Sequence, residues 1–176
     1  MAGTADTSTV RVYVPATFGM LGTLAREEKM PVHSGLGFAL TPALRDFYEA
    51  GDDEEIEYSA FLEAARASLR LLTAGDSEFP HRRVVISADL PAEAVTYTPE
   101  KGESVVTLAP PEITVAQLAA IHVDDEDNEA ATAAAVEVVD AADLGDEDAE
   151  IAVGDAEDKL MSWYDAKELG VLVDLL

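Results

Sequence analysis

The sequence predicts an α+β protein, with a mixed β-sheet and helices packed on it around a ferredoxin-like core with additions. Three observations support this fold class. Residues 52–75 have the periodicity of one long helix; apolar runs typical of strands at 10–15, 82–89 and 118–124 are separated by helical segments; and a turn at 99–102 joins two short extended runs. A doubly wound α/β sheet is the alternative, because it also alternates strands with helices.

The first fifty residues predict a strand followed by two short helices. Residues 1–8 have no apolar pattern and are expected to be flexible, whereas residues 10–14 alternate apolar and polar side chains as a strand does. Thr17 is a suitable N-cap for the first helix. Thr41 followed by Pro42 is the usual start of a second helix, because proline is tolerated in the first helical turn.

The segment 52–75 is the central packing element of this prediction. Asp52 and Glu55 have the spacing of a capping box, and Gly75 stands where a left-handed residue ends a helix. Glu63 has the spacing to pair with Arg66 on the exposed side. The polar positions form a single narrow stripe, so other structure is expected to cover most of the helix: Ser59, Glu63, Arg66, Arg70 and Thr73.

The middle of the chain predicts two buried strands, a hairpin and a helix. Residues 82–89 have a continuous apolar centre, as a strand buried on both faces does, and residues 118–123 form a similar strand. Residues 94–98 and 104–108 flank the turn and predict the hairpin. The alanine-rich residues 126–142 predict a helix.

The last thirty residues are the most difficult to assign. Residues 145–158 are strongly acidic and are expected to be irregular, with a short edge strand at 151–153. Residues 159–164 and 165–176 predict one or two helices, the second of which starts with a capping-box pair. Its apolar end is expected to dock on the body of the protein, or to form the interface of a structural homo-oligomer.

Length and composition indicate one cytoplasmic domain spanning 1–176. A chain of 176 residues can form a single sizeable core, and without cysteine it has no disulfide, thiolate zinc site or cysteine nucleophile. The first residues lack the basic and apolar regions of a signal peptide, and no apolar run reaches the roughly 20 residues of a membrane span. We therefore expect no membrane partner.

The net charge of −25 is unevenly distributed. Residues 1–83 hold 13 acids and 8 bases, whereas residues 84–176 hold 23 acids and 3 bases. Such a charge repels nucleic acid and attracts basic proteins, unless it serves only as a solvated surface that favours solubility. Two aromatic residues near the C-terminus would anchor a partner or close the core. The residues expected to bind a basic partner are Asp124, Asp125, Glu126, Asp127, Asp146, Glu147, Asp148, Trp163 and Tyr164.

A metal site is a second hypothesis. If the three predicted strands are parallel neighbours, their carboxyl ends bring Asp89, His122 and Asp124 together. An imidazole with two carboxylates can hold a divalent cation, whose bound water would act as a nucleophile. In the alternative interpretation, the aspartates cap helices or end strands, and His122 is a half-buried histidine with its hydrogen bonds satisfied.

The arginines interrupt the acidic trend and offer a phosphate-binding alternative. Arg66 and Arg70 lie one helical turn apart, and Arg82 and Arg83 open a strand. They would bind phosphate or carboxylate, or be neutralised by Glu63, Glu78 and other acids. The sequence has no nucleophile elbow, P-loop, dinucleotide-binding fingerprint or zinc-protease motif, and it identifies no cofactor.

Several blocks together resemble a family of proteins of unknown function from actinobacteria. The blocks are RVYVPAT (11–17), TPAL (41–44), EEIEYSAFLEAARASL (54–69), RRVVISAD (82–89), AAIHVDD (119–125) and SWYDAKEL (162–169). The resemblance spans nearly the whole chain. It implies a small acidic cytoplasmic protein and no catalytic residues. The leading functional hypothesis is a non-catalytic interaction or regulatory protein; a small metal- or phosphate-dependent enzyme and a structural homo-oligomer are the alternatives.

Overall fold

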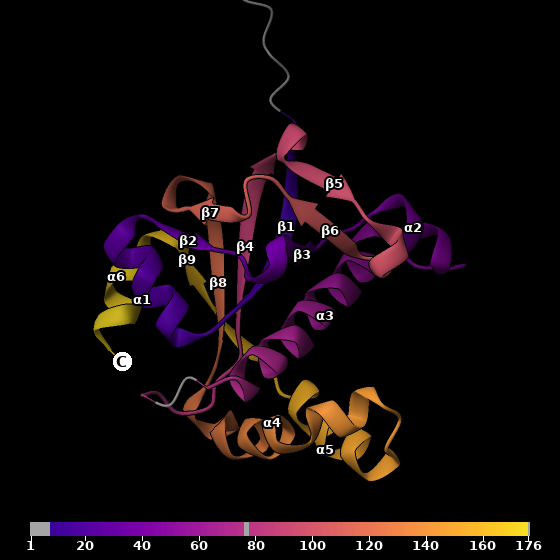
Figure 1. Ribbon diagram of the computed structural model, residues 1–176, viewed down its shortest axis with the longest axis vertical. Helices are drawn as coiled ribbons and strands as arrows, with labels where there is room; N and C mark the ends of the chain where they lie inside the picture. Colours follow the sequence, from indigo (N-terminus) through magenta and orange to yellow (C-terminus); the bar gives the residue numbers. More distant parts are fainter. Residues whose placement is uncertain (1–7, 76–77, 176) are drawn as a thin grey trace, which may run out of the picture.

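The computed structural model describes residues 8–75 and 78–175. The predicted flexible segment 1–8 lies outside the described residues except for Ser8. Seven strands form one sheet in the order β5-β6-β3-β1-β4-β8-β9, and β2 pairs with β7 in a separate ribbon (Figure 1). The strands are β1 (Thr9–Ala16), β2 (Lys29–Pro31), β3 (Leu36–Phe38), β4 (Val84–Pro91), β5 (Val95–Tyr97), β6 (Val105–Leu108), β7 (Glu112–Thr114), β8 (Leu118–Asp124) and β9 (Met161–Asp165).

Six α-helices accompany the sheet in the described residues. They are α1 (Phe18–Glu27), α2 (Pro42–Phe47), α3 (Asp53–Thr73), α4 (Glu129–Asp143), α5 (Glu147–Glu157) and α6 (Leu169–Asp174). The α+β class is therefore confirmed. None of these helices combines the length with the apolar character that crossing a membrane would demand.

The expected parallel arrangement of the central strands is wrong. All the strand pairs in the described residues are antiparallel, including β1 with β4 and β4 with β8, so the sheet is neither mixed nor doubly wound. The reason lies in the connection through α3. It joins β3 to β4 across the inserted β1, which makes one split βαβ unit of the kind found in ferredoxin-like folds. The later helices α4 and α5 instead join β8 to its immediate antiparallel neighbour β9.

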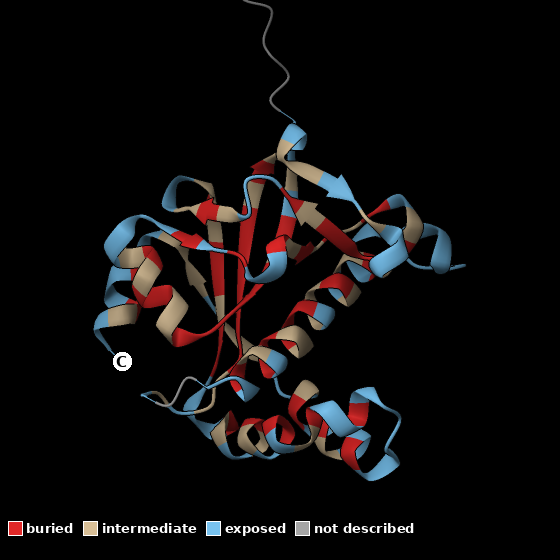
Figure 2. Cartoon of the chain, in the orientation of Figure 1, coloured by how far each residue is buried: buried red, intermediate tan, exposed pale blue. Residues whose placement is uncertain are grey.

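Alternate residues of the strands face two different layers of helices, as the two-residue period of a strand requires. On one face, Val12 and Val14 lie in the main core with residues of α1, α6 and the β2–β7 ribbon. On the other face, Tyr13 and Val85 contact α3, which crosses the sheet diagonally (Figures 1 and 2). The sheet is thus the middle layer of the molecule, and α3 is the main helix on its second face.

The central helix α3 begins as its sequence predicts. Asp52 accepts a hydrogen bond from the Glu55 backbone N–H at 2.9 Å, the Glu55 carboxylate accepts one from Asp52 N–H at 3.2 Å, and Gly75 has a φ of +104° beyond the end. Other parts of the protein cover α3 less completely than expected, because Tyr58 on this helix is 50% exposed. The predicted pair of Glu63 with Arg66 does not form: Glu63 accepts a hydrogen bond from the Ser104 hydroxyl at 2.8 Å.

Two predictions for the C-terminal part are wrong. Residues 147–157 form the helix α5, capped by Asp146, and not an irregular segment with a strand at 151–153. The helix forms because Ala149, Val153 and Ala156 share one buried face against α3 and α4. Residues 161–165 form the strand β9 and not a helix, since their backbone pairs with β8 at the edge of the sheet. The capping box of Asp165 with Glu168 is confirmed ahead of α6.

A buried ion pair joins the sheet to this C-terminal part. Arg83 precedes β4 and Asp124 ends β8, and their side chains are only 1% and 0% exposed. The closest nitrogen–oxygen distance between them is 2.7 Å, and Asp124 also accepts hydrogen bonds from Asn128 and from Thr132, the latter at 2.8 Å in α4. Arg83 in turn donates to the Lys159 carbonyl at 2.9 Å, just before β9. One charge pair therefore holds two strands, α4 and the start of β9 in place.

Replacing Asp124 by asparagine is expected to destabilise the fold strongly. The substitution keeps the size of the side chain but leaves the Arg83 guanidinium buried without its counter-ion, which costs about 3–5 kcal/mol. Urea unfolding followed by circular dichroism measures the change. The exposed neighbour Glu126→Gln is the matched control, with an expected change within about 0.5 kcal/mol. Equal unfolding midpoints for the two variants would contradict the role of this pair.

Candidate functional site

The helices α4 and α5 form a hairpin that packs against the C-terminal half of α3 (Figure 1). The turn between them contains Gly145, whose φ of +96° favours glycine over other residues. Leu69 and Leu72 of α3 contact apolar residues of both hairpin helices, including Val139 and Val153. The buried side of the hairpin is therefore apolar, and its acidic residues are left to the sides and the outer surface.

Residues 125–158 contain 14 Asp and Glu residues and no Lys or Arg. Four of these acids are paired with arginines outside the hairpin. The other ten are exposed, and none has an ion-pair partner among residues 8–75 and 78–175. We call these ten the acidic hairpin surface: Asp125, Glu126, Asp127, Glu137, Asp140, Asp146, Glu147, Asp148, Asp155 and Asp158. Six residues expected to bind a partner belong to it, whereas Asp124 is buried in the ion pair with Arg83.

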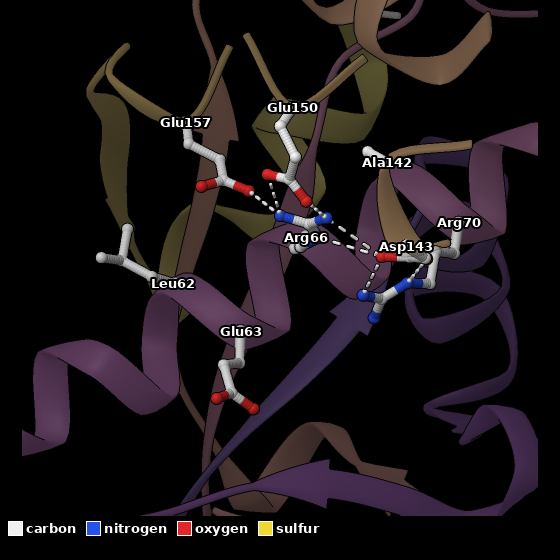
Figure 3. Close-up of a pocket in the computed structure, with 8 residues that line it drawn as sticks. All are labelled: Leu62, Glu63, Arg66, Arg70, Ala142, Asp143, Glu150 and Glu157. Carbon is white, nitrogen blue, oxygen red and sulfur yellow. Dashed lines mark hydrogen bonds and ion pairs between the residues drawn. The ribbon is translucent and has the colours of Figure 1, made fainter. Parts of the chain in front are cut away.

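The acids that face α3 meet two of its arginines (Figure 3). Arg66 contacts Asp143 at 3.1 Å, Glu150 at 2.8 Å and Glu157 at 3.2 Å. Arg70 donates two hydrogen bonds to Asp143, at 2.7 and 2.9 Å. These groups line a polar cavity of about 460 Å³ between α3 and the hairpin. Two arginines thus tie both hairpin helices to the central helix.

The electrostatics of this cluster favour the charged forms of Arg66 and Asp143. Hydrogen bonding from Arg70 and then from Arg66 holds the pKa of Asp143 below its ordinary value, although partial burial opposes the shift. The hydrogen bond to Glu150 raises the pKa of Arg66. Arg82 is also paired, donating to Glu129 at 2.7 Å. Because each of these guanidinium groups already contacts a carboxylate, the arrangement does not favour phosphate binding.

Sequence reasoning missed the acids that neutralise the arginines. It expected Glu63, Glu78 and other acids nearby, whereas the partners of Arg66 and Arg70 come from α4 and α5, more than 70 residues away. One signal was present: Glu150 and Glu157 are seven residues apart and therefore lie on one face of a helix. The prediction of an irregular segment there concealed it.

Three large apolar side chains are exposed on the hairpin or just after it. Leu144 is 90% exposed in the turn between the helices, Ile151 is 64% exposed on α5, and Leu160 is 78% exposed before β9. Sequence reasoning did not single these residues out, because isolated apolar residues within acidic segments resemble ordinary helix-face positions. Their exposure gives the acidic hairpin surface an apolar component.

The structure separates the residues of the predicted metal site. Asp89 lies opposite Arg11 near the end of β4 and is bound by its guanidinium at 2.7 Å, whereas Asp124 lies beyond the other end of β4. The antiparallel direction of β4 causes this separation. Within residues 8–75 and 78–175, no group of three or more histidine, aspartate or glutamate side chains is positioned to hold a metal ion.

His122 lies on the α3 face of the sheet in a partly buried position. Its Nε2 is 2.8 Å from the Ser87 hydroxyl, and its ring contacts Phe61 edge to face at 4.8 Å between centroids. Burial, with a smaller contribution from Arg11, lowers the pKa of His122 to about 4. Ser87 is only 2% exposed, so the pair resembles a hydrogen-bonded core contact more than an accessible nucleophile.

The two aromatic residues of the predicted partner set lie on β9. Trp163 is directly opposite His122 and is 60% exposed, so the interpretation that it closes the core under the last helix is wrong. Tyr164 points to the other face, where it packs partly buried against the main core. Their opposite orientations follow from the two-residue period of a strand, which the expected helix did not have.

Comparison with known proteins identifies one relationship. Residues 10–173 match the protein family described as a family of unknown function (DUF6912). No curated protein and no solved structure matches the chain.

The environment of His122 predicts a pH-dependent contribution to stability. Its pKa in the folded protein, about 4, lies below the value of 6.5 expected in the unfolded chain, so the unfolded state binds more protons between these pH values. The contribution is therefore present at pH 7 and is lost as the pH falls from about 6.5 towards 4, with a total on the order of 2 kcal/mol.

The measurement is urea unfolding of the wild type and of His122→Gln at pH 7.0, 5.5 and 4.5. The difference in free energy of unfolding between the two proteins separates the effect of the histidine from that of the many carboxylates. This difference should become smaller as the pH falls. An NMR titration of the His122 ring gives the pKa directly. A value near 6.5 would show that the imidazole is not desolvated as described.

Proposed function

The chain belongs to the DUF6912 family of unknown function, and from that premise we propose that it is a non-catalytic interaction or regulatory protein. It binds a basic protein through the acidic hairpin surface. The resemblance of its sequence blocks implies that this interaction occurs in the cytoplasm of an actinobacterium. The observation that carries this proposal is the division of the hairpin acids. Those facing α3 are neutralised by arginines, whereas the ten outward-facing acids are exposed and lack an ion-pair partner in the described residues.

Exposed like charges on one supersecondary unit produce a directional field. The hairpin helices are held together and to α3 by buried apolar contacts and by the Arg66 ion pairs, so the carboxylates are presented on a fixed frame. A negative potential of this kind accelerates the approach of a positively charged surface and orients it, with a strong dependence on ionic strength. The same potential opposes direct binding to nucleic acid.

The exposed apolar residues add a surface for direct contact to the electrostatic attraction of a partner. Leu144 and Ile151 lie among the carboxylates of the hairpin and are 90% and 64% exposed. A complementary partner would present Lys or Arg side chains around an apolar patch, because interfaces commonly combine a buried apolar centre with a charged rim. A basic nucleic-acid-binding protein fits this description, with the hairpin carboxylates in the place of phosphates.

The alternative functions have less support. The enzyme hypothesis required Asp89, His122 and Asp124 at one edge, whereas Asp89 lies towards the opposite end of β4 from the other two. The homo-oligomer hypothesis required an apolar C-terminal surface. In α6, Leu169 and Leu172 are buried. Val171 in this helix and Leu175 just after it are 64% and 76% exposed and would be the residues of such an interface.

We expect neutralisation of three hairpin acids to weaken the interaction. The variant carries Glu137→Gln, Asp140→Asn and Asp155→Asn, which are exposed positions outside the helix caps. The control removes three exposed acids from other elements: Glu27→Gln, Glu93→Gln and Glu100→Gln. Immobilised wild type, variant and control are incubated with actinobacterial lysate at low salt, eluted at high salt and analysed by mass spectrometry. The recovered partner is then titrated calorimetrically against each protein.

A basic protein retained by the wild type and the control, and bound about tenfold more weakly by the hairpin variant, is the expected result. Affinity that stays constant from low to high salt, or that falls equally in variant and control, would refute binding through the hairpin. Light scattering of the purified protein tests the homo-oligomer alternative in the same samples.

A further inference from the structure

A second concave site lies away from the hairpin, between β1 and the N-terminal half of α3. Its volume is about 260 Å³, and its lining consists of three aromatic residues and two carboxylates: Tyr13, Glu54, Glu57, Tyr58 and Phe61. One side of this site is formed by the sheet, through Tyr13, and the other by successive turns of α3. We call it the aromatic–acidic cavity.

The aromatic rings of the cavity are held in fixed relative orientations. Tyr58 and Phe61 stack with centroids 5.7 Å apart and an interplanar angle of 14°, and Tyr13 meets Phe61 edge to face at 5.7 Å. His122, which belongs to β8, contacts Phe61 with 4.8 Å between the ring centroids and thereby supports the position of the Phe61 ring. Tyr58 is 50% exposed, so this aromatic cluster is accessible from solvent.

The carboxylates are arranged to present negative charge beside these rings. The Tyr13 hydroxyl donates to Glu57 Oε1 at 2.7 Å, and partial burial together with this contact raises the pKa of Tyr13, which stays a neutral donor. Glu57 Oε2 and both oxygens of Glu54 accept no hydrogen bond from the described part of the chain. The Glu57 carboxylate is thus oriented through one oxygen and free at the other.

One positive charge near the cavity is already engaged. Arg11, two residues before Tyr13 on the same face of β1, donates to Asp89 at 2.7 and 3.2 Å. The hydrogen bond that Arg11 donates to Asp89 raises the pKa of Arg11, which stays cationic. Because Arg11 and Asp89 offset each other, the two lining carboxylates of Glu54 and Glu57 make the local charge negative.

From this geometry we propose that the aromatic–acidic cavity binds a guanidinium group presented by an arginine side chain of another polypeptide. A guanidinium is planar, stacks on aromatic faces and forms hydrogen bonds with carboxylate oxygens, which are the two chemistries that the cavity offers side by side. The free oxygens of Glu54 and Glu57 would accept its N–H groups, and Tyr58 with Phe61 would supply the aromatic surface.

The source of the guanidinium follows from the surrounding charges. Free arginine carries an α-carboxylate as well as an α-ammonium group, and the carboxylate would lie beside like charges, with Arg11 already engaged by Asp89. An arginine within a peptide has neither of these charges, so its guanidinium could enter without a carboxylate beside it. This inference does not rest on the acidic hairpin surface, since it concerns different residues on a different part of α3, and either proposal can fail alone.

The test is an NMR titration of the isotope-labelled protein with N-acetyl-arginine methylamide. The neutral citrulline analogue, the lysine analogue and free arginine are titrated in parallel. Tyr58→Leu and Glu54→Gln are the cavity variants, both at exposed positions that should leave the fold intact. Glu27→Gln, on α1 at the opposite face of the sheet, is the matched control for the loss of one charge.

We expect saturable shifts confined to the residues of the cavity, with millimolar affinity for the blocked arginine and about tenfold weaker binding by each cavity variant. The control should bind as the wild type does, and the citrulline analogue and free arginine should bind weakly. Shifts spread over the acidic hairpin surface would overturn the proposal. If the lysine analogue bound as tightly as the blocked arginine, the assignment to a guanidinium would be overturned. If free arginine bound more tightly than the blocked arginine, the assignment to a polypeptide would be overturned.

Discussion

The ion pair between Arg83 and Asp124 is the interaction on which the arrangement of the C-terminal third depends. Two opposite charges that are almost completely excluded from water lose a large hydration energy, which close contact and additional hydrogen bonds must recover. Both Asp124 oxygens accept hydrogen bonds, from Arg83, Asn128 and Thr132, and Arg83 also donates to the Lys159 carbonyl. The requirement fixes where β8 ends, where α4 begins and where the chain returns as β9. A metal ligand predicted from the sequence is thus a structural carboxylate with no free oxygen.

The same principle of satisfied charge distinguishes the two sides of the hairpin. Arg66 and Arg70 are only partly exposed, and their environment is stable because Asp143, Glu150 and Glu157 converge on them from both hairpin helices. The outward-facing acids have no such partners in the described residues, and water stabilises them individually. An incoming cationic surface would therefore find charges that are already positioned by the apolar packing of the hairpin.

The sheet face beside α3 has a different character from the hairpin. Its polar groups are paired locally, Arg11 with Asp89 and Ser87 with His122, and its aromatic residues lie together where α3 meets the strands. Trp163 on the edge strand extends this face next to His122. The acidic hairpin and this aromatic face would recognise different features of a binding partner, charge density in one case and individual side chains in the other.

The sequence by itself determined the features that depend on neighbours a few residues apart. The capping boxes at Asp52 and Asp165, the extent of α3 and the β5–β6 hairpin are local, and so is the excess of acids after residue 84. Only the tertiary structure decided which distant groups meet. Arg66 and Glu150 are 84 residues apart, and their contact depends on α5 forming and packing against α3. The strand β9 forms because β8 offers an unpaired edge. Asp89 lies away from His122 because β4 runs antiparallel to its neighbours. Periodicity indicates which side of an element is buried, but strand direction and helix partner are set by the global chain path.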